Sequence, residues 1–235
     1  MSHAIPCQAL LFDADGVLVD SDESVGVSWT RWAERWDLDP VAVLAMVHGR
    51  RSVDTVNLLI DPTRRTQALA DIDRFEIEDA AAVPACPGAT ELLISLPLDA
   101  WAVVTSGTRA LATARLAAAG LPAPQVLVTA DDVPRGKPDP AGYLRAAQAL
   151  GRPPHECVVL EDSPAGVAAG TAAGATVVGV TPRALDSEAA IVVRDLSNLS
   201  WTDATLHIPA TVIVRSNSRN PGQRVINGGV PNVGT

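Results

Sequence analysis

The segment Gln8-Ala-Leu-Leu-Phe-Asp-Ala-Asp-Gly16 joins an apolar run to two aspartates and a glycine. The run before Asp13 predicts a short buried strand, and the Asp-Ala-Asp-Gly that follows predicts a loop. Side chains at positions i and i+2 of an extended backbone point the same way, so Asp13 and Asp15 should face one ligand. Gly16 lets the chain turn tightly beside that ligand. Taken alone, Asp-x-Asp-Gly is also typical of an ordinary turn or a calcium-binding loop. The other motifs of the chain are needed to distinguish these alternatives.

Apolar runs alternate with helical segments along much of the remaining chain. Further runs lie at Ala100–Val104, Gln125–Val128, Glu156–Leu160 and Thr176–Val180. Ala-rich helical segments, each closed by a glycine, lie at Thr108–Ala119, Pro140–Leu150 and Pro164–Ala173. This alternation predicts an α/β fold: a doubly wound parallel sheet with helices on both faces and a ligand crevice at the carboxyl ends of its strands.

One interval, from Val19 to about Pro87, interrupts the alternation because it contains no clear strand. We interpret residues 19–87 as a helical insertion in a core made of residues 1–18 and 88–204. Three tryptophans in it follow the spacing of one helix face and predict its packed interior rather than a substrate contact: Trp29, Trp32 and Trp36. Residues 205–235 are rich in Asn, Gly, Pro and Ser, and we leave them as a tail of unknown structure, either frayed, a loosely attached hairpin or a remnant of cloning.

Composition limits the possible functions. With 235 residues, 47% of them hydrophobic, the chain can bury one full core and a smaller unit. A formal net charge of -9 without a basic run predicts no nucleic-acid partner. No apolar run approaches the about 20 residues that cross a bilayer, and no positive leader precedes a long apolar region, so we expect no membrane association. Cys7, Cys86 and Cys157 form no CxxC pair, which is typical of reduced thiols in a cytoplasmic protein.

Polar residues follow the predicted strands. Thr105-Ser106-Gly107 stands at a helix start, where hydroxyls and free amides favour an anion, although Thr105 or Ser106 could equally be a plain N-cap. Lys137 stands in a stiff Arg-Gly-Lys-Pro-Asp-Pro loop. Glu161-Asp162 follows another strand and either caps a helix or holds a metal. Two close carboxylates need a cation, and Mg²⁺ is the hard divalent ion that suits both carboxylates and a phosphate.

Four polar clusters in this order resemble the motifs of the haloacid dehalogenase superfamily over about residues 8–200. The motifs match here as Asp13-Ala14-Asp15-Gly16, Thr105, Lys137 and Glu161-Asp162. The resemblance implies a Rossmann-like core with a helical cap and a Mg²⁺-dependent phosphohydrolase. It implies that Asp13 attacks phosphorus and that Asp15 serves as general acid and base.

The same resemblance implies roles for the residues around these two aspartates. Thr105 and Lys137 would bind the phosphoryl oxygens, with further substrate contacts from Gly16, Ser106 and Gly107. The Mg²⁺ ligands would be the Asp13 side chain, the Asp15 backbone carbonyl and Asp162, with Glu161 binding directly or through water.

The insertion resembles the small cap of the β-phosphoglucomutase-like and sugar-phosphatase branch, which would close over the substrate. Its stretch His48-Gly-Arg-Arg-Ser-Val-Asp54 is similar to one in sugar- and glycerol-phosphate phosphatases. We expect Arg51 first, and also His48 and Arg50, to reach the distal end of a substrate, although an arginine pair is also typical of a solvated helix start. The resemblance favours a monomer that hydrolyses a hexose or polyol phosphate.

Sequence features argue against three other functions: a mutase, a silent binding module and a dehalogenase. Mutases of this branch carry a histidine ten residues after the second aspartate, where this chain has Val25. A catalytically silent regulatory binding module would lack the nucleophile or the metal acids, which are present. Dehalogenation of haloalkanoic acids uses no metal and does not need Asp15. The sequence therefore predicts a phosphatase of a small phosphorylated metabolite.

Overall fold

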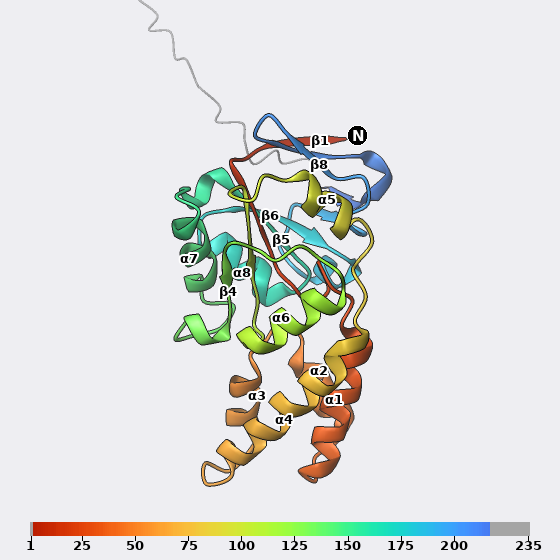
Figure 1. Ribbon diagram of the computed structural model, residues 1–235, viewed down its shortest axis with the longest axis vertical. Coiled ribbons are helices and arrows are strands. Elements are labelled where there is room, and N and C mark those ends of the chain that lie inside the picture. Colours follow the sequence, from red (N-terminus) through yellow and green to blue (C-terminus); the bar gives the residue numbers. More distant parts are fainter. Residues whose placement is uncertain (1, 217–235) are drawn as a thin grey trace, which may run out of the picture.

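The computed structural model describes residues 2–216, with a layered α/β core from which a group of helices projects (Figure 1). The helices are α1 (Asp22–Arg35), α2 (Pro40–Val47), α3 (Ser52–Leu59), α4 (Arg65–Asp79), α5 (Ala89–Ser95), α6 (Arg109–Ala118), α7 (Ala141–Ala149) and α8 (Pro164–Ala172). The strands are β1 (His3–Pro6), β2 (Ala9–Phe12), β3 (Trp101–Val104), β4 (Leu127–Val128), β5 (Cys157–Glu161), β6 (Thr176–Val180), β7 (Ile191–Val193), β8 (Ser200–Thr202), β9 (Thr205–Ile208) and β10 (Ile213–Ser216).

The main sheet has seven strands in the order β10-β7-β6-β5-β2-β3-β4. β2 lies inside the sheet and pairs in parallel with both β3 and β5, so that Leu11 stands opposite Ala102 and Val159. From β2 the sheet extends through β3 and β4 on one side and through β5, β6 and β7 on the other. Only β10 is antiparallel to its neighbour. The predicted doubly wound, mostly parallel sheet is therefore confirmed.

The apolar run of β2 is explained by burial on both faces of the sheet. Leu10 and Phe12 pack in one cluster with residues of α5 and α6, whereas Ala9 and Leu11 pack in another with residues of α7 and α8. Each fully buried leucine contributes about 1.5–3 kcal/mol relative to an exposed one. A strand covered on both faces needs apolar residues at every position, which is why residues 9–12 show no polar alternation.

Helices α1 to α4 form the insertion and lie together below the sheet in Figure 1. Trp29, Trp32 and Trp36 are buried in one cluster with Ile72 and Phe75 of α4. The indole N–H of Trp32 donates to the carbonyl oxygen of Ala68 at 2.8 Å, so even the polar atom of this ring has a partner. The predicted tryptophan stripe thus packs inside the insertion, and Trp29 also lines the cleft between the insertion and the core.

The segment that follows residue 204, expected as a tail, begins with ordered strands. β9 pairs with β1 and β8 in a small antiparallel sheet, and β10 extends the main sheet next to β7. Leu206 and Ile208 of β9 are buried in the main core cluster. The alternating pattern of β9 is only four residues long, too short to stand out among its polar neighbours. Residues 217–235 of the expected tail lie outside the described residues.

Two further expectations concern membrane-spanning segments and cysteine thiols. Over residues 2–216, none of the helices combines the length and the apolar character needed to cross a membrane. Cys7, Cys86 and Cys157 are free thiols. Burial raises the pKa of Cys86 to about 12 and that of Cys157 to about 11, so both thiols stay protonated and poorly nucleophilic at neutral pH.

Candidate active site

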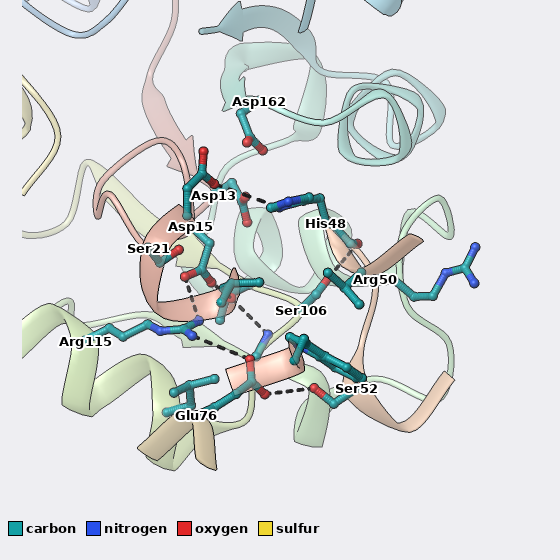
Figure 2. Close-up of a pocket in the computed structure, with 18 of the residues that line it drawn as sticks. Asp13, Asp15, Ser21, His48, Arg50, Ser52, Glu76, Ser106, Arg115 and Asp162 are labelled. Carbon is teal, nitrogen blue, oxygen red and sulfur yellow. Dashed lines mark hydrogen bonds and ion pairs between the residues drawn. The ribbon is translucent and has the colours of Figure 1, made fainter. Parts of the chain in front are cut away.

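The carboxyl ends of β2, β3 and β5 meet at a cleft between the sheet and the helical insertion (Figure 2). Asp13 follows β2, Thr105 follows β3 and Asp162 follows β5. These three polar residues are only 4%, 5% and 2% exposed. The insertion supplies the facing wall, which includes His48 and Glu76, and the cleft measures about 570 Å³ when its open mouth is counted. The topology therefore gathers polar groups from distant parts of the sequence.

Lys137, the only lysine of the 235-residue chain, lies beside Asp13. Its Nζ donates to Asp13 Oδ1 at 2.6 Å and to the carbonyl oxygen of Val104 at 3.3 Å, and it also forms an ion pair with Glu161. Burial acts to lower the pKa of Lys137, but the two carboxylates outweigh burial and raise this pKa above its ordinary value. Lys137 is therefore a fixed positive charge next to the end of β2.

Three buried carboxylates, Asp13, Glu161 and Asp162, have oxygens within 4.8 Å of one another. Burial, and next the charge of Glu161, raise the pKa of Asp13 well above its ordinary value and the pKa of Asp162 to about 7, although nearby cations oppose both shifts. The shifts reflect concentrated negative charge, which a divalent cation would relieve. Carboxylate oxygens are the ligands that Mg²⁺ prefers, so this donor set fits Mg²⁺.

Glu161 has hydrogen-bond donors at both of its oxygens. Oε1 accepts from Lys137 and from the Tyr143 hydroxyl at 2.9 Å, and Oε2 accepts from the backbone N–H and the hydroxyl of Ser163 at 3.0 and 3.1 Å. Gly166 makes room for this carboxylate, because a Cβ there would overlap it. This geometry favours a role for Glu161 in holding Lys137 over direct metal ligation.

Asp15 turns away from the three-carboxylate cluster (Figure 2). Its Oδ1 accepts from Arg115 Nη1 at 2.8 Å, and its Oδ2 accepts from the Thr105 hydroxyl at 3.4 Å. The Asp15 side chain is 31% exposed and lines the cleft, whereas Asp13 is almost completely enclosed. The two aspartates thus differ sharply in environment. The family resemblance implies that Asp15 would bind the metal only through its backbone carbonyl. The position of the Asp15 side chain, away from the carboxylate cluster, is compatible with that prediction.

The sequence left open whether Thr105 or Ser106 is the N-cap of α6, and the structure shows that neither is. Thr108 is the N-cap, and its side chain accepts from the N–H of Leu111 at 3.3 Å. Thr105 Oγ1 instead accepts from the N–H of Gly107 at 3.0 Å, and the Ser106 hydroxyl donates to Gly49 in the insertion at 3.0 Å. The alternative that Thr105 or Ser106 is merely the helix N-cap is therefore wrong. Thr105, Ser106 and Gly107 all line the cleft.

His48 and Arg50, two of the insertion residues expected near a substrate, line the cleft. The His48 side chain is 38% exposed, and its Nδ1 lies 3.9 Å from Asp22 Oδ1. Burial, and next the charge of Arg183, lower the pKa of His48 below its ordinary value. At neutral pH this imidazole is therefore predominantly uncharged and can both donate and accept a hydrogen bond.

Arg51 and Gly16, also expected as substrate contacts, do not line this cleft, although Arg51 lines a smaller cavity that includes Thr105 and Lys137. Arg51 pairs with Asp54 through Nε and Nη2, each at 2.8 Å, and its Nη1 donates to the carbonyl oxygen of Val133 at 3.1 Å, so it joins the insertion to the core. Gly16 has φ +81°, and a Cβ there would overlap the Asp162 carboxylate. Both residues therefore have structural contacts, and their contact with a substrate stays a prediction.

Besides Asp22, three charged residues of the cleft were not identified from the sequence: Glu76, Arg115 and Arg183. Burial raises the pKa of Glu76 to about 7, against the opposing effect of Arg115. Arg183 forms an ion pair with Asp162, and its Nη2 lies 2.8 and 2.7 Å from the carboxylate oxygens of Asp22 at the start of α1. None of the three belongs to a recognisable motif. The one available signal was a charge at position 115 in the buried face of α6, between Leu111 and Leu116.

The class is therefore that of doubly wound α/β proteins with polar residues at the strand ends and a helical insertion facing them. The chain belongs to the haloacid dehalogenase-like hydrolase family, whose model matches residues 7–174.

Relatives within this family are similar over most of the chain. Hexitol phosphatase A of Escherichia coli (strain K12) is 43% identical over 206 residues, covering 83% of this chain and 94% of that protein. Validoxylamine A 7'-phosphate phosphatase of Streptomyces hygroscopicus subsp. limoneus is 36% identical over 218 residues, covering 81% of this chain and 95% of that protein. The crystal structure of a hydrolase from Pseudomonas syringae has a TM-score of 0.70 at 28% identity, covering 80% of this chain and 93% of that one.

Proposed function

We propose that the protein is a Mg²⁺-dependent phosphatase of a sugar or polyol phosphate and that it works through an aspartyl-phosphate on Asp13. The observation that carries the proposal is the Asp13 carboxylate, held 2.6 Å from the Lys137 ammonium in the strand-end site beside the cleft. Phosphoryl transfer depends mainly on positioning and on neutralising charge on the equatorial oxygens, and this arrangement supplies both.

The reaction begins when an Asp13 oxygen attacks phosphorus and the bond from phosphorus to the ester oxygen breaks. Asp15 gives its proton to the departing alkoxide, so the alcohol leaves neutral. Asp15, now a carboxylate, takes a proton from the water that attacks the aspartyl-phosphate, and inorganic phosphate leaves with Asp13 restored. Both steps balance in protons and electrons and need no further reactant.

Residues around the two aspartates stabilise the transferring group. The Lys137 ammonium and the donors at Thr105 to Gly107 neutralise phosphoryl oxygens. When bound, Mg²⁺ supplies a further positive charge, with Asp13 and Asp162 as its side-chain ligands. Glu161 forms a second ion pair with Lys137 and so keeps it in place.

The substrate class is supported by the facing wall of the cleft and by the relatives. The cleft includes groups that can bond to hydroxyls, among them Ser52 and His48. The names of the two relatives given above refer to phosphates of a hexitol and of validoxylamine A. At the position where mutases of this branch carry a histidine, Val25 lines the cleft and offers no proton. These observations favour hydrolysis over a mutase reaction.

A substrate panel tests this proposal. With Mg²⁺, the purified protein is expected to hydrolyse p-nitrophenyl phosphate, and to show kcat/KM values at least about tenfold higher for hexitol or hexose phosphates than for an unsubstituted alkyl phosphate. Phosphate release and sugar-phosphate isomers are measured in the same reactions. Isomer formation without phosphate release would point to a mutase, and absence of turnover on the whole panel would contradict a phosphatase.

Removal of the metal is expected to suppress hydrolysis. After EDTA treatment, kcat should fall by at least about 10²-fold, because the buried carboxylates Asp13, Glu161 and Asp162 would then repel a phosphate dianion. Added Mg²⁺ should restore activity and should also raise Tm, since it binds only the folded arrangement of ligands. Full activity after verified removal of divalent ions would contradict the metal requirement.

A further inference from the structure

Arg115 links the candidate general acid to the helical insertion. It lies in α6 of the core and is 3% exposed. Its Nη1 donates to Asp15 Oδ1 at 2.8 Å, and its Nη2 lies 3.5 Å from Oε1 of Glu76 on α4. Figure 2 shows Arg115 between these two carboxylates. Asp15 is 100 residues away in sequence and Glu76 is 39 residues away, so the contact exists only in the folded chain.

The exposure of these side chains indicates which partner faces the substrate. Asp15 is 31% exposed at the cleft, whereas the side chains of Arg115 and Glu76 are only 4% and 6% exposed. The Thr105 hydroxyl binds the other oxygen of Asp15 at 3.4 Å. Arg115 and Thr105 together therefore fix the plane of the Asp15 carboxylate while leaving one side of it toward the cleft.

Packing alone does not account for an arginine at this position. The neighbouring buried residues of α6 are Leu111, Ala112 and Leu116, so a leucine or methionine at position 115 would continue an apolar face. The Nε of Arg115 is buried without a hydrogen-bond partner among the described residues. A buried charge with an unsatisfied donor is unfavourable, and apolar residues of similar size commonly replace such groups without loss of stability.

We propose that Arg115 is a positioning residue that orients Asp15 for proton transfer and is itself held by Glu76 of the insertion. This inference rests on the proposed phosphatase function, in which Asp15 protonates the leaving oxygen. Proton transfer requires the acid to lie within hydrogen-bond reach of that oxygen. The guanidinium bridges the two carboxylates with one N–H group to each, so the position of Glu76 on the insertion helps to set the orientation of Asp15.

The proposal predicts a loss that depends on the leaving group. An alkoxide leaves poorly unless it is protonated, whereas p-nitrophenolate leaves without a proton. The ratio kcat/KM reports steps up to the departure of the leaving group and is not affected by later hydrolysis of the aspartyl-phosphate. An Asp15 that is present but wrongly oriented should therefore reduce kcat/KM for an alkyl phosphate much more than for p-nitrophenyl phosphate.

The test compares Arg115→Met and Arg115→Lys with Arg109→Met on these two substrates. We expect Arg115→Met to lower kcat/KM by about 10²-fold for a hexitol phosphate, mainly through kcat, and by less than about threefold for p-nitrophenyl phosphate. Arg115→Lys should recover part of the loss, because it restores a charge but not the planar guanidinium that reaches both carboxylates. Arg109 begins the same helix, pairs with Asp132 at an exposed site and does not line the cleft. Arg109→Met should therefore leave kcat/KM unchanged for both substrates.

Glu76→Gln tests the same link from the insertion and retains an acceptor for the Ser52 hydroxyl, which bonds to Glu76 at 3.0 Å. Glu76→Gln should lower kcat/KM for the hexitol phosphate by about three- to tenfold more than for p-nitrophenyl phosphate. This comparison remains available even if Arg115→Met does not fold. Equal losses on both substrates in Glu76→Gln and Arg115→Lys, or no loss in either, would overturn the positioning role. A wild-type protein that hydrolyses neither substrate would instead refute the proposed function, so the two failures are distinguishable.

Discussion

Asp13→Asn is expected to abolish turnover while the protein remains folded. The amide cannot attack phosphorus, and Glu161, which also pairs with Lys137, already accepts hydrogen bonds from Tyr143 and Ser163. Removing a nucleophile in other enzymes lowers kcat by about 10⁴- to 10⁶-fold, and we expect a fall of at least about 10⁴-fold here. Steady-state kinetics on p-nitrophenyl phosphate and on a hexitol phosphate measure this change.

The stability of the same variant distinguishes loss of chemistry from loss of structure. Burial and the charge of Glu161 raise the pKa of Asp13, so at neutral pH the charged carboxylate costs stability in the metal-free protein. The Tm of Asp13→Asn in EDTA should therefore equal or exceed that of the wild type. Asp99→Asn, an exposed site outside the cleft, serves as the matched control and should change neither activity nor Tm. Substantial turnover in a folded Asp13→Asn protein would refute the nucleophile assignment.

Lys137→Met is expected to cost both activity and stability. Its ammonium is 6% exposed and is shared by the carboxylates of Asp13 and Glu161, which would remain buried without their cation. Removing one partner of a buried ion pair destabilises a protein by about 3–5 kcal/mol. Activity should fall by at least about 10³-fold, because a group that neutralises the transferring phosphoryl is lost.

Matched variants identify the origin of the Lys137→Met effect. Arg135→Met removes an 80% exposed cation two residues earlier in the same loop and should have little effect on either quantity. Adding Asp13→Asn to Lys137→Met should recover part of the lost stability, because one unpaired buried charge disappears. Denaturant unfolding measures both free energies. Additive effects of the two substitutions, or an active and stable Lys137→Met protein, would contradict the coupling between these residues.

The fold was largely predictable because its central strands are buried on both faces. Ala9–Phe12 and Thr176–Val180 are continuous apolar runs followed by loop residues, and that pattern predicts strands of a covered parallel sheet. β7, with only three residues, was not predicted, and β9 was assigned to a tail. Such short strands gain their stability from neighbours that are adjacent only in the folded chain.

The part of the candidate site that could be predicted consists of residues that directly follow a buried strand. Asp13 and Asp162 directly follow buried strands, and strand ends of a parallel sheet meet at one edge, so their proximity could be anticipated. Arg115 and Glu76 could not be placed together in this way, because their contact depends on how α6 packs against α4. The partners of Arg51 were not predictable either: the Asp54 carboxylate three residues later and a core carbonyl bind its guanidinium.

The most direct test of the account is to identify the phosphorylated residue during turnover. The wild-type protein is mixed with Mg²⁺ and a hexitol phosphate, quenched in acid within a single turnover, digested and analysed by mass spectrometry. We predict one phosphoryl group on Asp13, formed and lost at rates that account for kcat, and none in Asp13→Asn. A phosphoryl group on another residue, or turnover at the wild-type rate with no phosphorylated enzyme at any quench time, would contradict the account.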